Sequence, residues 1–237
     1  CRALGHDARV LSSLFGDGPT GFSSRLRIKL TGRPAVPDNV VGYPVYRSWH
    51  PWEAAGYVAK QFKPDVALIQ CHNAVKIGKA LSAAGIPLVL YHRNVEFEEL
   101  GGDVRDLGPT KYIANSQYTA DTYKAEFGIE SEVIPPTISF EKYHTDTTRS
   151  TVTYINLYPE KGLEKAIEIA AACPDIPFLF VESWKLSNEQ FTALTERLKP
   201  LTNITLQRRT DKMSTIYGQT KILLAPSKWA EAWGRVA

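Results

Sequence analysis

The stretch Thr151-Val-Thr-Tyr-Ile-Asn-Leu-Tyr-Pro-Glu-Lys-Gly-Leu-Glu-Lys-Ala166 reads as a strand, a loop and the start of a helix. Its first five residues are β-branched or aromatic, whereas helical spacing begins at Gly162. Lys161 lies at the start of that helix, where the helix dipole disfavours a cation unless an anion lies between them. The stretch therefore predicts a turn in which Lys161 either binds a diphosphate or is exposed to solvent.

The same alternation of apolar strands and helices extends on both sides of this stretch. After it, we expect helices at 162–172, 188–198 and 211–219 and strands at 178–181, 204–207 and 221–225. Before it, we expect strands at 8–15, 66–70, 87–91, 111–114 and 132–134 and helices at 75–84 and 117–127. Such alternation is typical of a parallel sheet covered by helices. The predicted fold class is α/β with two Rossmann-like domains.

The boundary between the two domains is expected near Pro135-Pro136, because core-forming residues are sparse in the segment that follows, 137–150. We assign residues 1–140 to the first domain and 141–237 to the second. The chain opens in what reads as the last turn of a helix and ends where another helix starts. We therefore expect the first domain to lack its first strand and the second to be truncated.

Composition excludes several classes of protein. The 237 residues are 43% hydrophobic and 22% charged, which is typical of a globular chain and not of a disordered one. No apolar run is long enough for a membrane span and no signal segment is present, so a cytoplasmic location is expected. The three cysteines lack metal-binding spacing. The net charge of +3 is too small for a dedicated nucleic-acid binder.

Two features near the N-terminus each have two interpretations. Residues 16–21 fit G-x-G-x-x-G, with Asp38 at the spacing of a dinucleotide fingerprint, but Pro19 removes a phosphate-binding N–H, and a surface loop is the alternative. The segment 22–33 carries four basic residues and no acidic one. It is either a solvated face or a contact for an anionic partner, namely headgroups at the inner face of the plasma membrane or an anionic acceptor.

Side chains that follow the predicted strands are the candidate site residues, because ligands of parallel sheets bind at the carboxyl ends of the strands. His92 ends one strand, and its imidazole is expected to face a cleft or, alternatively, to be structural. Asn156 and Arg209 follow two other strands. Glu231 precedes a predicted helix, so its carboxylate is expected to point into the site, and Gly234 permits close approach of a ligand.

Together these residues resemble the retaining glycosyltransferases of the GT-B fold, family 4. The resemblance rests on the order and spacing of six short motifs. They are Gly5-His6 with Val10, His92, Ala-Asn-Ser-x-x-Thr-Ala at 114–120, Val-Ile-Pro-Pro at 133–136, Pro-Glu-Lys-Gly-Leu at 159–163, and Pro-Ser-x-Trp-x-Glu-x-Trp-Gly-x-Val at 226–236.

This resemblance implies transfer of a hexose-like unit from a UDP- or GDP-sugar to a hydroxyl of a glycan or lipid-linked acceptor. Lys161, with Gly162, would hold the donor diphosphate, and Glu231 would contact the donor sugar. The backbone at Trp233 and Gly234 would approach the donor, and His92 would lie over the reacting sugar. No metal or other cofactor is implied, because the sequence offers no Asp-x-Asp-like pair after a strand.

The sequence departs from the family pattern at three places. Asn156 replaces an arginine of the phosphate site, Glu182-Ser183-Trp184 replaces a glycine turn, and the second motif glutamate would fall beyond Ala237. A non-catalytic protein that binds a nucleotide or glycan is therefore the main alternative. An NAD-dependent oxidoreductase built on residues 16–21 is the more distant one.

Overall fold

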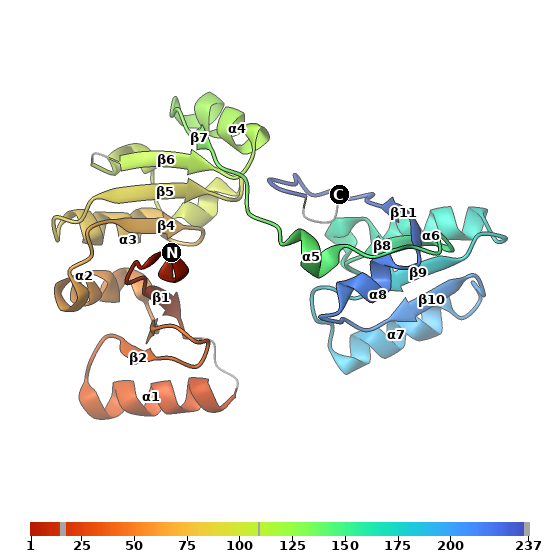
Figure 1. The fold of residues 1–237 in the computed structure, drawn as a ribbon, viewed down its shortest axis with the longest axis horizontal. Coiled ribbons are helices and arrows are strands. Elements are labelled where there is room, and N and C mark those ends of the chain that lie inside the picture. The colour runs from red at the N-terminus through yellow and green to blue at the C-terminus, as the bar shows by residue number, and fades with distance from the viewer. Residues whose placement is uncertain (15–17, 109, 235–237) are drawn as a thin grey trace. The chain divides into compact units, whose positions relative to one another are not determined.

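The computed structural model describes residues 1–14, 18–108 and 110–234. The chain folds into two compact units, Cys1–Pro135 and Pro136–Ala237, which we call unit 1 and unit 2 (Figure 1). Each unit contains a parallel sheet connected by helices. This confirms the predicted α/β class with Rossmann-like units.

A four-stranded parallel sheet forms the larger part of unit 1, in the order β4-β5-β6-β7. Its strands are β4 (Ala67–Gln70), β5 (Leu88–His92), β6 (Thr110–Ala114) and β7 (Glu132–Val133). The connections contain α3 (Ala74–Ser82), the 3-10 turns η2 (Phe97–Leu100) and η3 (Val104–Asp106), and α4 (Gln117–Phe127). The core combines Leu88 and Leu90 of β5 with Val75 of α3 and Tyr123 of α4, all buried. Burial of these side chains fixes the sheet against its helices.

The N-terminal part of unit 1 is a second, three-stranded sheet in the order β1-β3-β2, with β2 antiparallel to β3. Its elements are η1 (Arg2–Leu4), β1 (Val10–Ser13), α1 (Pro19–Thr31), β2 (Val36–Asp38), β3 (Val45–Ser48) and α2 (Pro51–Phe62). The sequence analysis did not predict α1, β2, β3 or α2. The buried face of α2 contains small or β-branched side chains and no large apolar one. These residues are Ala54, Ala55, Val58 and Ala59.

Unit 2 is built on a parallel sheet in the order β10-β9-β8-β11 (Figure 1). The elements are α5 (Phe140–Tyr143), β8 (Thr151–Ile155), η4 (Pro159–Lys161), α6 (Leu163–Ala172), β9 (Phe178–Val181), α7 (Asn188–Leu198), β10 (Ile204–Gln207), α8 (Met213–Tyr217) and β11 (Thr220–Leu224). Strand β8 is central: Tyr154 lies opposite Phe180 of β9 and opposite Leu224 of β11. The predicted strands and helices of this half are confirmed, with small shifts at their ends.

Close packing around β8 and β9 holds unit 2 together. Phe178 and Phe180 are buried against Ala166 and Ala170 of α6, whose small side chains let the helix approach the sheet. Helix α7 begins with a capping box in which Ser187 and Gln190 satisfy each other's backbone N–H groups. These contacts fix the helices at the strand ends that carry the candidate site.

Among the described residues, no helix is both long and apolar enough to cross a membrane. The cysteines Cys1, Cys71 and Cys173 are free thiols.

Candidate functional site

The strand order of unit 2 changes direction at β8. The connection through α6 leads from β8 to β9 on one side, whereas the connection through α8 returns the chain from β10 to β11 on the other side. Where connections leave adjacent parallel strands in opposite directions, a crevice opens at their carboxyl ends, and ligands of α/β sheets bind there. The loops after β8 and β11 are therefore the candidate site in unit 2.

Lys161 and Glu231 meet at this switch point. Lys161 belongs to the loop after β8 and Glu231 to the loop after β11, and Lys161 Nζ lies 2.6 Å from Glu231 Oε1. The hydroxyl of Ser227 donates a second hydrogen bond, of 3.1 Å, to the same oxygen. Only 14% of the Lys161 side chain is exposed, against 38% for Glu231. The Lys161 ammonium, which is mostly buried, is thus bound to an oxygen of a carboxylate.

Two indole rings surround the Lys161 ammonium group. Its Nζ lies 5.2 Å from the ring centroid of Trp184 and 5.2 Å from that of Trp229. The two indoles contact each other edge to face, and Tyr158 packs on Trp184 in the same manner. Both tryptophans are also partly exposed to solvent. Aromatic faces stabilise the cation and also offer flat apolar surface to a ring-shaped ligand.

The loop that carries Glu231 is fixed against the loop that carries Lys161. Gly162 has a left-handed backbone, with φ of +88°, and an added Cβ would lie 2.1 Å from the carbonyl oxygen of Pro226. The N–H of Lys228 donates to the carbonyl of Glu160 at 3.0 Å. Only glycine permits this approach of the two backbones. The glycine that follows Lys161 therefore has a structural cause.

Two buried polar atoms at the same end of unit 2 have no hydrogen-bond partner among the described residues. They are Oδ1 of Asn156 and Nε1 of Trp233. Asn156 has a left-handed backbone, with φ of +82°, directly after β8. Unsatisfied buried polar groups are rare and often mark a place where a ligand or water binds. Gly234 is exposed and is the last described residue.

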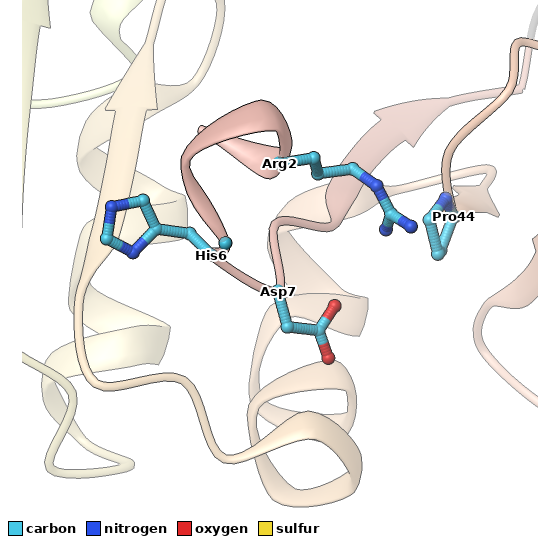
Figure 2. A pocket seen from close by; sticks show the side chains of 5 residues that line it. Arg2, His6, Asp7 and Pro44 are labelled. Atoms are coloured by element: carbon cyan, nitrogen blue, oxygen red, sulfur yellow. The ribbon is translucent and has the colours of Figure 1, made fainter.

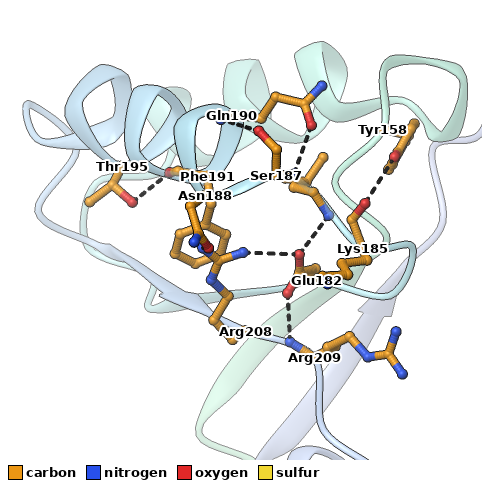
Figure 3. A network of polar contacts seen from close by, with 11 residues as sticks. Tyr158, Glu182, Lys185, Ser187, Asn188, Gln190, Phe191, Thr195, Arg208 and Arg209 are labelled. Carbon is orange, nitrogen blue, oxygen red and sulfur yellow. Dashed lines mark hydrogen bonds and ion pairs between the residues drawn. The ribbon is translucent and has the colours of Figure 1, made fainter. Parts of the chain in front are cut away.

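A network around Glu182 organises the neighbouring loops (Figure 3). The buried carboxylate of Glu182, at the end of β9, accepts hydrogen bonds from the backbone N–H groups of Leu186 at 2.7 Å and Arg209 at 3.0 Å. The guanidinium of Arg208 donates to it at 3.3 Å and also packs on the ring of Phe191. Burial acts to raise the pKa of Glu182, but the two backbone hydrogen bonds and Arg208 outweigh it and hold the pKa below its usual value.

Arg209 is positioned by this network through its backbone. Its side chain extends away from Glu182 in Figure 3 and is exposed. Among the described residues it forms no ion pair, so its guanidinium is available to an anionic ligand. The sequence analysis selected Arg209 as a site residue but did not select Glu182. Glu182 directly follows a predicted strand, and this position was the signal that could have identified it.

His92 lies in unit 1, at the end of β5, and is buried. It is 1% exposed, and its ring stacks on Tyr123 of α4 with centroids 3.6 Å apart. Neither ring nitrogen has a partner among the described residues, and burial lowers the pKa of His92 to about 4. The expectation that this imidazole faces an open cleft is therefore corrected: the aromatic packing of α4 covers it. A role in catalysis stays a prediction.

The dinucleotide interpretation of residues 16–21 gains no support from the described part of this segment. Gly16 lies outside the described residues, Gly18 is the N-cap of α1, and Pro19 is its first residue. Asp38, which would bind the ribose, is paired with Arg47 at 2.9 Å and accepts the N–H of Val40 at 3.0 Å. Its carboxylate therefore already has two partners.

A shallow depression lies near the N-terminal turn of unit 1 (Figure 2). It is lined by Arg2, Gly5, His6, Asp7 and Pro44. The Asp7 carboxylate is bound to Arg9 at 2.9 Å, and this hydrogen bond lowers its pKa. No predicted site residue lines the depression.

The structure thus brings some predicted site residues together and leaves others apart. Lys161, Gly162 and Glu231 form one constellation, whereas His92 belongs to the other unit. The sequence analysis included Trp184, Ser227 and Trp229 in its motifs but did not select them as site residues. Within the described ranges, no group of three or more His, Cys, Asp or Glu side chains is arranged to hold a metal ion.

Comparisons with known proteins give little beyond these observations. No family model and no curated protein matches the chain. One similar solved structure is a GtfA/B complex bound to UDP and GlcNAc, with 10% identity and a TM-score of 0.32. The match covers 81% of this chain and 44% of that one, so the chain spans less than half of its length. A likeness this low assigns no role to any residue.

Proposed function

We propose that the chain is a glycosyltransferase that moves a hexose-like unit from a UDP- or GDP-sugar to a hydroxyl of a glycan or lipid-linked acceptor, with retention of anomeric configuration. The observation that carries the proposal is the Lys161 ammonium at the switch point of unit 2, paired with the Glu231 carboxylate, which also accepts a hydrogen bond from the Ser227 hydroxyl. It supplies a cation at a sheet edge suited to nucleotides.

The donor diphosphate would bind Lys161 in place of Glu231. The Glu231 carboxylate supplies an oxygen anion 2.6 Å from Nζ, which is the geometry that a phosphate oxygen would adopt. The start of α6 adds a positive dipole end next to Lys161. Arg209 is a further cation in the same unit, with its side chain free of ion pairs among the described residues.

The displaced Glu231 would then bind hydroxyl groups of the donor sugar. A carboxylate accepts hydrogen bonds from two vicinal hydroxyls, and the neighbouring indoles of Trp184 and Trp229 offer apolar surface for a sugar or base. The unsatisfied Nε1 of Trp233 could donate to the same ligand. This division of roles leaves charge recognition to Lys161 and sugar recognition to Glu231.

In the proposed reaction, the bond between the anomeric carbon and the diphosphate breaks, and a bond from the acceptor oxygen to that carbon forms on the same face. The acceptor proton passes to the departing diphosphate. Lys161 and the α6 dipole would stabilise the negative charge that develops on the leaving group. We propose that no divalent metal is required, so chelation with EDTA should leave turnover unchanged.

Isothermal calorimetry with UDP, GDP and NAD tests the nucleotide assignment. The proposal expects binding of UDP or GDP, no binding of NAD, and weaker binding of UDP or GDP by Lys161→Met. Product analysis with a panel of sugar nucleotides then tests transfer. Failure of both UDP and GDP to bind would refute the assignment, whereas NAD binding would favour the oxidoreductase.

A non-catalytic nucleotide- or glycan-binding protein is the second candidate. Two observations favour it. Asn156 occupies a position where the family that this chain resembles carries an arginine, and His92 is buried. Under this alternative, UDP or GDP binds with the same dependence on Lys161, but no sugar nucleotide is turned over.

A further inference from the structure

Helix α1 presents its large apolar side chains to solvent. Phe22, Leu26 and Leu30 are 63%, 46% and 75% exposed, respectively. Their spacing of four residues places them in one row along the helix. The side of α1 that packs against the protein instead buries Gly21 and Ser24. A surface helix usually has the opposite arrangement, with its apolar stripe towards the core.

Basic side chains are also concentrated on and next to this helix. Residues 19–33 contain Arg25, Arg27, Lys29 and Arg33 and no acidic residue. Within the described ranges, none of the four forms an ion pair, and Arg27 donates to the carbonyl of Pro37 at 2.7 Å. Helical geometry places Arg25 and Lys29 along one flank of the apolar row and Arg27 along the other.

We infer that α1 binds the surface of an anionic lipid bilayer, with Phe22, Leu26 and Leu30 in the acyl boundary and the flanking cations at the headgroups. A helix that lies in the membrane interface needs such an apolar row beside basic side chains, and these can reach the headgroups through their long stems. The helix is 13 residues long, or about 20 Å, which is enough for three turns of contact.

Charge favours a membrane over a second copy of this chain. A two-fold contact through α1 would bring two helices of the same positive sign together, without an acidic residue on either to compensate. An anionic bilayer instead offers many negative headgroups to the same helix. This inference does not depend on the proposed glycosyl transfer.

Co-sedimentation of the full chain with vesicles tests the inference. One set of vesicles contains phosphatidylcholine alone and the other also contains phosphatidylglycerol. The apolar variant combines Phe22→Gln, Leu26→Gln and Leu30→Gln, which keeps good helix formers in an exposed helix. The charge variant combines Arg25→Gln and Lys29→Gln. Controls are Phe140→Gln, an exposed phenylalanine in unit 2, and the exposed pair Lys111→Gln with Lys212→Gln.

The wild-type chain should bind the phosphatidylglycerol vesicles and not those of phosphatidylcholine alone. The charge variant should bind about 25-fold less, at about fivefold per basic residue. The apolar variant should lose at least about tenfold, and both controls should bind as the wild type does. Circular dichroism confirms that each variant keeps its helix content.

Three results would overturn the inference. The first is the absence of wild-type binding to the anionic vesicles, and the second is equal binding by the wild type and the apolar variant. The third is a concentration-dependent dimer, measured by ultracentrifugation, that the apolar variant abolishes while vesicle binding is absent. The third result would assign the apolar row to a contact between copies of the chain.

Discussion

The Glu231 carboxylate lies 2.6 Å from the Lys161 ammonium, at the place proposed for a phosphate oxygen of the donor. These two residues neutralise each other, and a diphosphate that binds as proposed would have to separate them. Glu231 is therefore both a proposed sugar ligand and a competitor of the diphosphate.

Replacement of Glu231 by glutamine should strengthen the binding of inorganic pyrophosphate. The neutral amide no longer competes for Lys161, and loss of a partly exposed ion pair of about 1 kcal/mol corresponds to about fivefold tighter binding. Calorimetry with pyrophosphate measures the change. Glu168→Gln, which removes a carboxylate paired with Lys165 on the surface of α6, is the matched control and should have no effect. Weaker binding by Glu231→Gln would contradict the exchange.

Replacement of Lys161 by methionine should weaken the binding of UDP or GDP by about 1.5–3 kcal/mol, the range for a charge-assisted contact. Methionine keeps the apolar length of the side chain between Trp184 and Trp229, so the loss reports the charge. Lys165→Met, four residues along the same segment, removes an equal charge away from the indoles and serves as the control. Equal affinities of Lys161→Met and the wild type would refute the phosphate role.

The sheet of unit 2 could be predicted from sequence because its strands are short runs rich in β-branched, aromatic and aliphatic residues. Residues 178–181, for example, are buried at all four positions, and turn residues bound the run. Helix α1 could not be predicted, since its apolar residues face solvent and Gly21 and Ser24 pack inward. The periodicity of its sequence therefore does not point to the core.

Only part of the candidate site could be predicted from the sequence. Lys161 and Glu231 follow recognisable strands, but the contact between them depends on β8 and β11 being neighbours in the sheet. Sequence periodicity does not give strand order. Trp184 and Trp229 also follow strands, and their position in the sequence was the signal that could have identified them.

Substitution of Gly162 by alanine should destabilise unit 2 and weaken pyrophosphate binding together. The left-handed backbone costs about 1–2 kcal/mol for any residue with a Cβ. The overlap with the Pro226 carbonyl adds about 1 kcal/mol or more, because the loop that carries Glu231 must move. Urea unfolding and calorimetry measure the two effects.

Gly128→Ala is the matched control for this substitution. Gly128 also has a positive φ, of +68°, but nothing lies within 4 Å of an added Cβ. It should show only the conformational cost and leave pyrophosphate binding unchanged. If Gly162→Ala cost no more stability than Gly128→Ala, the close approach to Pro226 would not be needed for folding.

Replacement of His92 by phenylalanine should remove a pH dependence of stability from unit 1. Burial lowers the pKa of His92 from 6.5 to about 4, so the folded chain binds fewer protons than the unfolded chain between these values. The wild type should therefore lose stability as the pH falls below about 6.5, by about 3 kcal/mol in total, and no more below pH 4. Phenylalanine keeps the stacking on Tyr123 and cannot take up the proton.

Urea unfolding from pH 7 to pH 4 measures the free energy of unfolding of His92→Phe and of the wild type. The difference between the two values isolates the contribution of His92 protonation. It should rise in favour of the variant as the pH falls, and a constant difference would mean that folded His92 is readily protonated. Turnover of the same variant decides the second role of the residue. If the imidazole is catalytic and lies over the reacting sugar, kcat should fall by about a hundredfold or more. If His92 is purely structural, turnover should stay close to that of the wild type, because phenylalanine preserves the aromatic packing against α4.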